Sequence, residues 1–366
     1  MSTELPAGPA SLHLLPLLRH IDHVSAMRLE DWDRLLPLAR QARLLGTIAH
    51  RIADRPDLAE HIPARVRGHM AASINYAAHR LQMVRMELAQ LAEALPESLS
   101  VTLLKGAAYC VQGLPMARGR MPNDVDILVA RRDLDGAETA LKTGGWEMEI
   151  TDAYDEHYYR QWSHELPPMR VPGHALEVDL HHTISPVTSR VRANDEALFA
   201  ALESVPGSRY KVLNADDQII HAAIHLIQDS EISGRLRDLV DIDSLVRARV
   251  RSSSDGQRLW ARAQVHGASR PVWYALHFCH HWLGTPLPEG CLAAAPPALA
   301  RLLLELLFRH ACPPVVFERG GSAPRRLAEL AGQFRYHWLR MPPRLLVRHL
   351  AHKSARVLRG AKVLSA

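Results

Sequence analysis

The spacing of hydrophobic positions divides the chain into a helical first part, a mixed middle and a helical remainder. Over residues 12–95, apolar side chains recur every three or four positions, which predicts amphipathic helices. Short apolar runs bounded by turn residues then predict buried strands at 101–104, 124–129 and 175–182. After Pro186 the helical spacing returns and continues toward the C-terminus.

Two of the predicted strands carry acidic residues on one face. Asp124 and Asp126 are two positions apart, so both project from the same side of an otherwise apolar strand. The run ALEVDLHH places Glu177, Asp179 and His181 on a common face in the same way. Adjacent carboxylates repel one another unless a cation lies between them, and oxygen ligands favour Mg²⁺ or Mn²⁺. Carboxylates from two strands therefore predict a two-metal site for phosphoryl transfer.

A glycine turn precedes the first acidic strand. Lys105 and Gly106 follow the strand predicted at 101–104, where a turn into a helix lets backbone amides approach a phosphate. Beyond the acidic strand, residues 131–142 predict an amphipathic helix that ends at Gly144-Gly145. These neighbours add a cation and free amide groups to the acidic site.

Together these residues resemble a known family. The motifs Lys-Gly, Asp-Val-Asp-Ile-Leu-Val and Val-Asp-Leu-His, in this order, resemble poorly characterised bacterial nucleotidyltransferases of the polymerase-β-like superfamily. The resemblance covers residues 20–250 and is specific at 103–129 and 176–182. It implies an α+β fold, with a small mixed sheet, flanking helices, and N-terminal and C-terminal helical regions. It also implies Mg²⁺ and a nucleoside triphosphate, ATP as the first choice, bound at the strand ends.

The resemblance also implies a role for individual positions. Asp124 and Asp126 match the paired metal ligands and Asp179 the third carboxylate, so these residues are predicted to bind metal and to act in catalysis. The predicted nucleotide-binding residues are Lys105, Gly106, Arg120 and Asn123. Better-known relatives carry Gly-Ser where this chain has Lys-Gly, so a lysine would take over the phosphate contact of the serine hydroxyl.

A later helix carries two histidines on one face. Asn214 is a suitable N-cap for a helix that extends to Asp229, and His221 and His225 lie one turn apart within it. A zinc pair would need a third ligand and a glutamate where Ala222 stands. We therefore favour histidines that are packed or face the substrate.

Further candidate substrate-binding residues come from the strand pattern and from the family resemblance. His181 shares its face with Asp179 and could orient that carboxylate or bind phosphate. The resemblance adds His225, since a histidine recurs in that helix. It also adds Arg237 and Asp238, because RLRDLVDI resembles the segment that closes over the nucleotide. A charged helix is more often simply a solvated face.

The chain is predicted to have four parts. They are an N-terminal helical segment (1–95), a nucleotidyltransferase module (96–190), a helical region that closes over the substrate (191–285) and a C-terminal helical region with a basic tail (286–366). The aromatic stretch at 145–175 is interpreted as amphipathic outer strands, with a base-stacking loop as the alternative.

The cysteine count, the apolar runs and the net charge limit the class of protein. Four cysteines without paired spacing predict reduced thiols in a cytoplasmic protein and argue against a disulfide scaffold. No apolar stretch is long enough to span a bilayer. The net charge is only +5, but the tail after Arg325 intersperses leucine and valine with basic residues. It suits an anionic partner, and a solvated surface helix explains it equally well.

The predicted reaction moves a nucleoside monophosphate from a triphosphate to a hydroxyl group and releases pyrophosphate. The acceptor is a small molecule, a sugar, a peptide or a protein, because one catalytic centre can serve all of them. A catalytically inactive nucleotide-binding or antitoxin-like partner protein is one alternative. An enzyme that adds nucleotides to RNA ends is the second, supported by the basic tail, and a phosphohydrolase ranks last.

Overall fold

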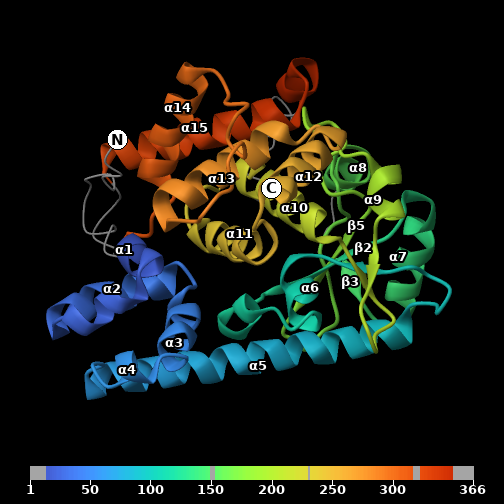
Figure 1. Ribbon diagram of the computed structural model, residues 1–366. Helices are drawn as coiled ribbons and strands as arrows, with labels where there is room; N and C mark the ends of the chain where they lie inside the picture. The colour runs from blue at the N-terminus through green and yellow to red at the C-terminus, as the bar shows by residue number, and fades with distance from the viewer. Residues whose placement is uncertain (1–13, 149–152, 230, 316–321, 349–366) are drawn as a thin grey trace.

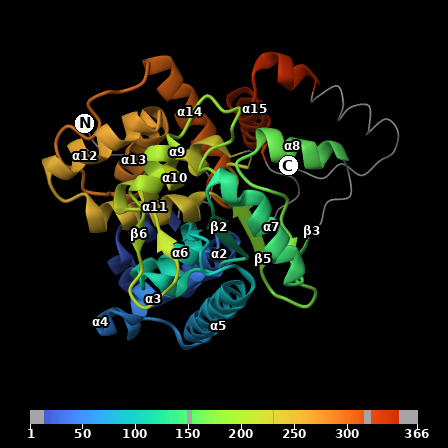
Figure 2. The same ribbon diagram turned by 90° about the vertical axis from the view of Figure 1, so that its right-hand side faces the viewer.

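Helices surround a central sheet in the computed structural model, which describes residues 14–148, 153–229, 231–315 and 322–348 (Figure 1). Among these residues a mixed seven-stranded sheet is combined with helices on all sides, so the predicted α+β class is confirmed. The long helix α5 (Ala64–Ala94) lies on the side opposite the last helices of the chain in both ribbon views (Figures 1 and 2).

The N-terminal part is helical, as predicted. Its hydrophobic face packs around Trp32, which is fully buried, and proline begins α4 and caps α5. These elements are α1 (Leu14–Arg19), η2 (Ile21–Ala26), α2 (Leu29–Gln41), α3 (Leu45–Ala53) and α4 (Pro56–Ala59).

The sheet has the strand order β3-β4-β5-β2-β1-β7-β6. The three strands predicted from the sequence are its neighbouring strands β5, β2 and β1, and the apolar side chains that alternate with the acids are fully buried. Two strands beyond residue 190, β6 and β7, extend the sheet and were not predicted. The strands are β1 (Thr102–Leu103), β2 (Asp124–Leu128), β3 (Glu147–Met148), β4 (Met169–Arg170), β5 (Glu177–His181), β6 (Glu203–Ser204) and β7 (Lys211–Val212).

The aromatic stretch differs from its interpretation as outer strands. Among the described residues of this stretch, β3 and β4 are strands on one side of the sheet, and most of the aromatic side chains lie instead on helix α8 (Ala153–Trp162). The reason is their spacing. Tyr158 and Trp162 are four residues apart, and their ring centres lie 5.8 Å from each other, as expected for residues on one helix face.

Short helices connect the strands. The predicted helix after the acidic strand is α7, which ends at Gly144, and Gly145 follows with a φ of 97°. These connections are α6 (Lys105–Val111), η3 (Pro115–Gly119), η4 (Arg131–Asp133), α7 (Leu134–Thr143) and α9 (Asp195–Ala200).

Helix α10 is the centre of the second half. Its predicted N-cap is confirmed, since the Asn214 side chain accepts from the Asp217 amide at 3.0 Å. It is buried on nearly all sides because α11, α12, α13 and α15 pack around it. The helices are α10 (Ala215–Gln228), α11 (Leu236–Arg249), α12 (Ser253–Val265), α13 (Ser269–Leu283), α14 (Ala298–Ala311) and α15 (Ala323–Arg340).

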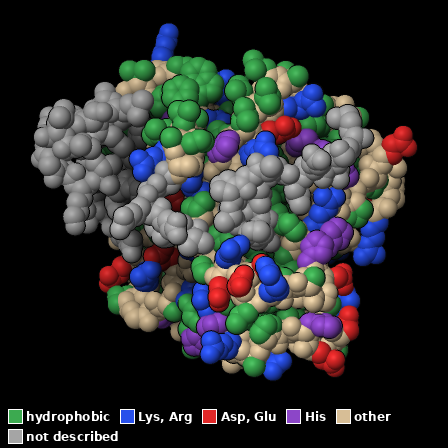
Figure 3. Space-filling view, turned by 90° about the vertical axis from the view of Figure 1, so that its left-hand side faces the viewer, with side chains coloured by type: hydrophobic (Ala, Val, Ile, Leu, Met, Phe, Trp, Pro, Cys, Tyr) green, Lys and Arg blue, Asp and Glu red, His purple; other side chains and the backbone are tan. Residues whose placement is uncertain are grey.

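The predicted basic tail falls partly outside the described residues, which end at 348. Inside them, Arg325 is buried and donates to Pro313 O at 2.8 Å and to Ser233 Oγ at 2.6 Å, so it serves the fold. On the outer side of α14 and α15, leucine and aromatic side chains are exposed, and Figure 3 shows hydrophobic side chains gathered at the top of this face.

None of the described helices is both long and apolar enough to cross a bilayer. All four cysteines are buried and unpaired, as predicted.

A backbone contact between α3 and η3 should limit what can replace Gly46. A Cβ atom there would lie 2.5 Å from Gly119 O, and backbone cannot move aside. We expect Gly46→Ala to lower the free energy of unfolding by about 1–3 kcal/mol in urea titrations. Gly68→Ala is the control, because Gly68 is an exposed helical residue with open space around its Cα, and we expect a gain of about 1 kcal/mol. Equal stability of the two variants would contradict the contact.

Candidate active site

The acidic face is assembled by the pairing of β2 with β5. The two strands are parallel, and their register places Asp124 opposite Glu177 and Asp126 opposite Asp179. Asp126 is only 3% exposed. The alternation predicted from the sequence therefore brings Asp126 and Asp179 to neighbouring positions on one face of the sheet.

Lys105 neutralises part of this charge. Leu104 N donates to Asp126 O at 3.0 Å, which fixes the turn beside β2, and Lys105 Nζ donates to Asp126 Oδ1 at 3.1 Å. Burial alone would raise the pKa of Asp126, but Lys105 and His181 outweigh it and hold that pKa well below its ordinary value. Lys105 has a φ of 40°, a left-handed conformation that is costly for a residue with a Cβ and often marks a functional position.

Asp179 lacks a comparable partner. Its Oδ1 atom is buried and accepts no hydrogen bond from the described residues. Burial raises the pKa of Asp179 well above its ordinary value, and the carboxylate of Glu165 acts in the same direction. A divalent cation would supply the missing partner, so the residues present fit a metal ion.

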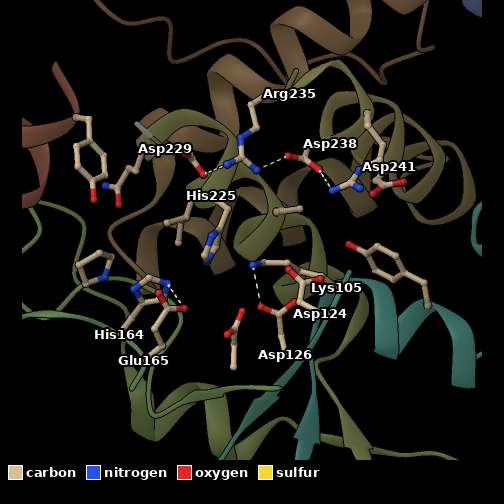
Figure 4. A pocket seen from close by; sticks show the side chains of 18 of the residues that line it. Lys105, Asp124, Asp126, His164, Glu165, His225, Asp229, Arg235, Asp238 and Asp241 are labelled. Carbon is tan, nitrogen blue, oxygen red and sulfur yellow. Dashed lines mark hydrogen bonds and ion pairs between the residues drawn. The ribbon is translucent and has the colours of Figure 1, made fainter. Parts of the chain in front are cut away.

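Arginines paired with aspartates form the opposite wall of a cleft of about 300 Å³. Figure 4 shows Arg235 and Asp238 facing Lys105 and Asp126 across this space. Arg235 Nη1 donates to Asp238 Oδ2 at 3.0 Å, and Arg237 Nη2 donates to Asp238 Oδ1 at 3.3 Å. Burial would raise the pKa of Asp238, but the arginines hold it below its ordinary value. An acidic floor suits a metal ion, and the N–H groups that Arg235 and Arg237 do not give to Asp238 could bind a polyphosphate on that ion.

Arg120 joins the sheet module to α11. Its Nε donates to Asp241 Oδ2 at 2.9 Å in a buried ion pair, and its guanidinium lies 5.5 Å from the centre of the Tyr109 ring. Gly106 permits this arrangement, since a Cβ atom at that position would overlap Arg120 Nη1. The glycine predicted to face a phosphate therefore packs against the arginine.

Most of the predicted site residues meet at this cleft. Its walls include Lys105, Arg120, Asp124, Asp126, Asp179, His225, Arg237 and Asp238. His181 is fully buried beneath it, where its Nε2 donates to Asp126 Oδ1 at 3.0 Å. Asn123 is exposed outside the cleft, and its side-chain oxygen accepts from Arg43 Nη1 at 2.9 Å.

Several residues at the cleft were not predicted. Glu165 and His164 reach it through a backbone bridge between Glu165 and His181. Arg340, at the end of α15, also lines it and donates to Ser163 Oγ at 2.9 Å. Asp241 was seen in the sequence only as part of a charged helix. Local sequence carries no signal for these positions, since long-range packing brings them together.

The raised pKa of Asp179 predicts how stability should depend on pH. The folded protein binds this proton more tightly than the unfolded chain, so stability falls as pH rises from about 4, the ordinary aspartate value, through the folded pKa. Without metal, Asp179→Asn should therefore unfold at a higher temperature than wild type at neutral pH, and the difference should shrink toward pH 4. Asp135→Asn, an exposed change on α7, should show no such trend. If the unfolding temperature of wild type instead rises relative to that of Asp179→Asn as pH rises, the raised pKa of Asp179 is wrong.

Comparison with known proteins places the chain in a family. A family model described as "uncharacterised nucleotidyltransferase" matches residues 28–284, which includes the sheet, the acidic strands and the helices α10 to α13. Searches of curated proteins and of solved structures found no match. A match over this much of the chain shows the family, and with it nucleotidyltransferase activity in general. The chain belongs to this family of uncharacterised nucleotidyltransferases.

Proposed function

We propose that the protein transfers a nucleoside monophosphate from a nucleoside triphosphate, ATP as the first choice, to a hydroxyl group of an acceptor, with Mg²⁺ or Mn²⁺ as the metal. The observation that supports this most is the buried Oδ1 of Asp179, which has no hydrogen-bond partner among the described residues and lies beside Asp126 at a cleft that Arg235 and Arg237 also line. Membership of the polymerase-β-like superfamily and a cytoplasmic location stay predictions.

The metal ligands would be the three aspartates. Asp124, Asp126 and Asp179 would hold two ions, which would offset the phosphate charge and lower the pKa of the acceptor hydroxyl. Lys105 is already bound to Asp126, so it keeps that carboxylate ionised and in place and leaves its remaining N–H groups for a phosphate oxygen.

The rest of the machinery would act on the phosphates and the proton. The acceptor oxygen attacks the α-phosphorus, and the bond from that phosphorus to the bridging oxygen breaks as pyrophosphate leaves. Asp179 is the best candidate for taking the proton of the acceptor hydroxyl, because its carboxylate lies beside Asp126 at the cleft where the acceptor would bind. Arg235 and Arg237 would stabilise the charge on the leaving pyrophosphate.

Ligand-dependent thermal unfolding separates a chain that binds a metal–nucleotide complex at the aspartates from a partner protein that binds no nucleotide. With Mg²⁺ and ATP at about a hundred times the dissociation constant, wild type should gain about 2.7 kcal/mol of stability. Asp126→Asn should gain far less, because it loses a metal ligand, whereas the exposed Asp135→Asn should match wild type. If none of the four ribonucleoside triphosphates stabilises wild type in the presence of Mg²⁺, the chain does not bind nucleotide. The result would then favour a catalytically inactive partner protein.

Arg237 should matter for triphosphate affinity. Losing one charge-assisted contact to phosphate costs about 1.5–3 kcal/mol, so Arg237→Gln should weaken Mg²⁺·ATP binding by about 10- to 150-fold in calorimetric titrations. Arg249→Gln is the matched control, since Arg249 is exposed in the last turn of the same helix, and it should bind as wild type does. Equal affinities in the two variants would remove Arg237 from the nucleotide site.

A further inference from the structure

Four histidines lie together beside the carboxylates. The His164 ring centre is 5.1 Å from those of His181 and His225, and the His221 and His225 ring centres are 4.5 Å apart. Every one of these rings has a buried nitrogen without a hydrogen-bond partner in the described part of the chain. Unpaired buried nitrogens are costly, so a cluster of them calls for an explanation.

We propose that His164, Glu165 and His181 form a binding site for one transition-metal ion of the Zn²⁺ class, separate from the aspartates that would hold Mg²⁺. Among the described residues, these three make up the group of His, Cys, Asp or Glu side chains whose donor atoms all lie within 4.8 Å of one another. The site goes beyond the proposed transfer reaction, which needs neither histidine as a ligand.

The donor spacing is that of a tetrahedral ion. Glu165 Oε2 is 3.4 Å from His164 Nε2 and 3.4 Å from His181 Nε2. Ligand bonds of about 2.0–2.1 Å in a tetrahedron place the donor atoms about 3.4 Å apart. Two of the three distances between donor atoms therefore already have the length that a tetrahedral ion requires.

His164 provides the free donor. Its side chain is buried, with the residue 6% exposed, and Nε2 makes no hydrogen bond although it faces the Glu165 carboxylate. His181 Nε2 now donates to Asp126 Oδ1, so on metal binding its proton would move to Nδ1, which has no partner at present. Asp126 would keep Lys105 as its partner.

The backbone holds these ligands in place. Residues 164–166 run beside β5, with hydrogen bonds of 2.9 Å from His182 N to His164 O and from Leu166 N to Leu180 O. His164 and Glu165 both line the cleft, so a fourth ligand position would open toward it. Three protein ligands and one open position are the arrangement of a catalytic rather than a structural zinc site.

The ligand types select the ion. Two imidazole nitrogens and one carboxylate suit Zn²⁺ or Co²⁺, whereas Mg²⁺ prefers six oxygens in an octahedron. The aspartates on β2 and β5 offer only oxygen. The two sets of ligands should therefore sort a mixture of Mg²⁺ and a transition metal into neighbouring positions.

Cobalt binding provides the test. After chelator treatment, the full-length protein is titrated with Co²⁺ in excess Mg²⁺, and the visible absorption and the bound metal are measured. We expect one equivalent of Co²⁺ with the strong absorption of a four-coordinate site. His164→Gln and Glu165→Gln should weaken binding by at least about 10- to 100-fold, the loss seen when only a residue supporting a ligand is removed. The exposed His157→Gln should bind as wild type does.

Three results would overturn the site. Displacement of Co²⁺ by Mg²⁺, or unchanged Co²⁺ binding in His164→Gln, would show that the histidines are not ligands. Asp124→Asn should lose nucleotide-dependent stabilisation but keep the Co²⁺ absorption. If Asp124→Asn loses both, the ion sits on the aspartates and the separate site is wrong. Co²⁺ binding without any nucleotide binding would instead leave the histidine site standing and remove the proposed transfer function.

Discussion

Repulsion between carboxylates is the constraint around which this molecule is built. The parallel pairing of β2 with β5 holds Asp126 beside Asp179, and burial prevents water from screening them. Among the residues that the structure describes, Lys105 and His181 contact Asp126, and no hydrogen bond reaches Asp179 Oδ1. This buried oxygen needs a cation. Such an arrangement costs stability, and it persists where function requires it.

The surrounding helices turn this local conflict into a cleft. The buried ion pair between Arg120 and Asp241 fixes α11 over the sheet, and removing either partner would leave an uncompensated charge in the interior. Arg235 and Arg237 then face the acidic floor from the same region of the chain. One side is suited to metal and the other to phosphate, so a single cleft can bind a metal–polyphosphate complex.

Local sequence patterns predicted much of the fold and part of the candidate active site. The alternation predicted both strands and the acidic face of each, because that information lies within a few residues, and the pairing of β2 with β5 then joins the two faces. The two-residue strands β6 and β7 were not predicted because they depend on pairing, β7 with β1 and β6 with β7. Glu165 and Arg340 were missed for a similar reason, since Arg340 meets Ser163 across 177 residues of sequence. Packing, not local preference, places such residues.

The account depends on a metal ion between the aspartates and a triphosphate. A crystal structure with Mg²⁺ and an ATP analogue that cannot be cleaved at the α-phosphorus would test this most directly. We expect metal density in contact with Asp124, Asp126 and Asp179, with the phosphates directed at Arg235 and Arg237. A nucleotide bound away from the aspartates, or bound there with no metal ligand from the chain, would contradict it.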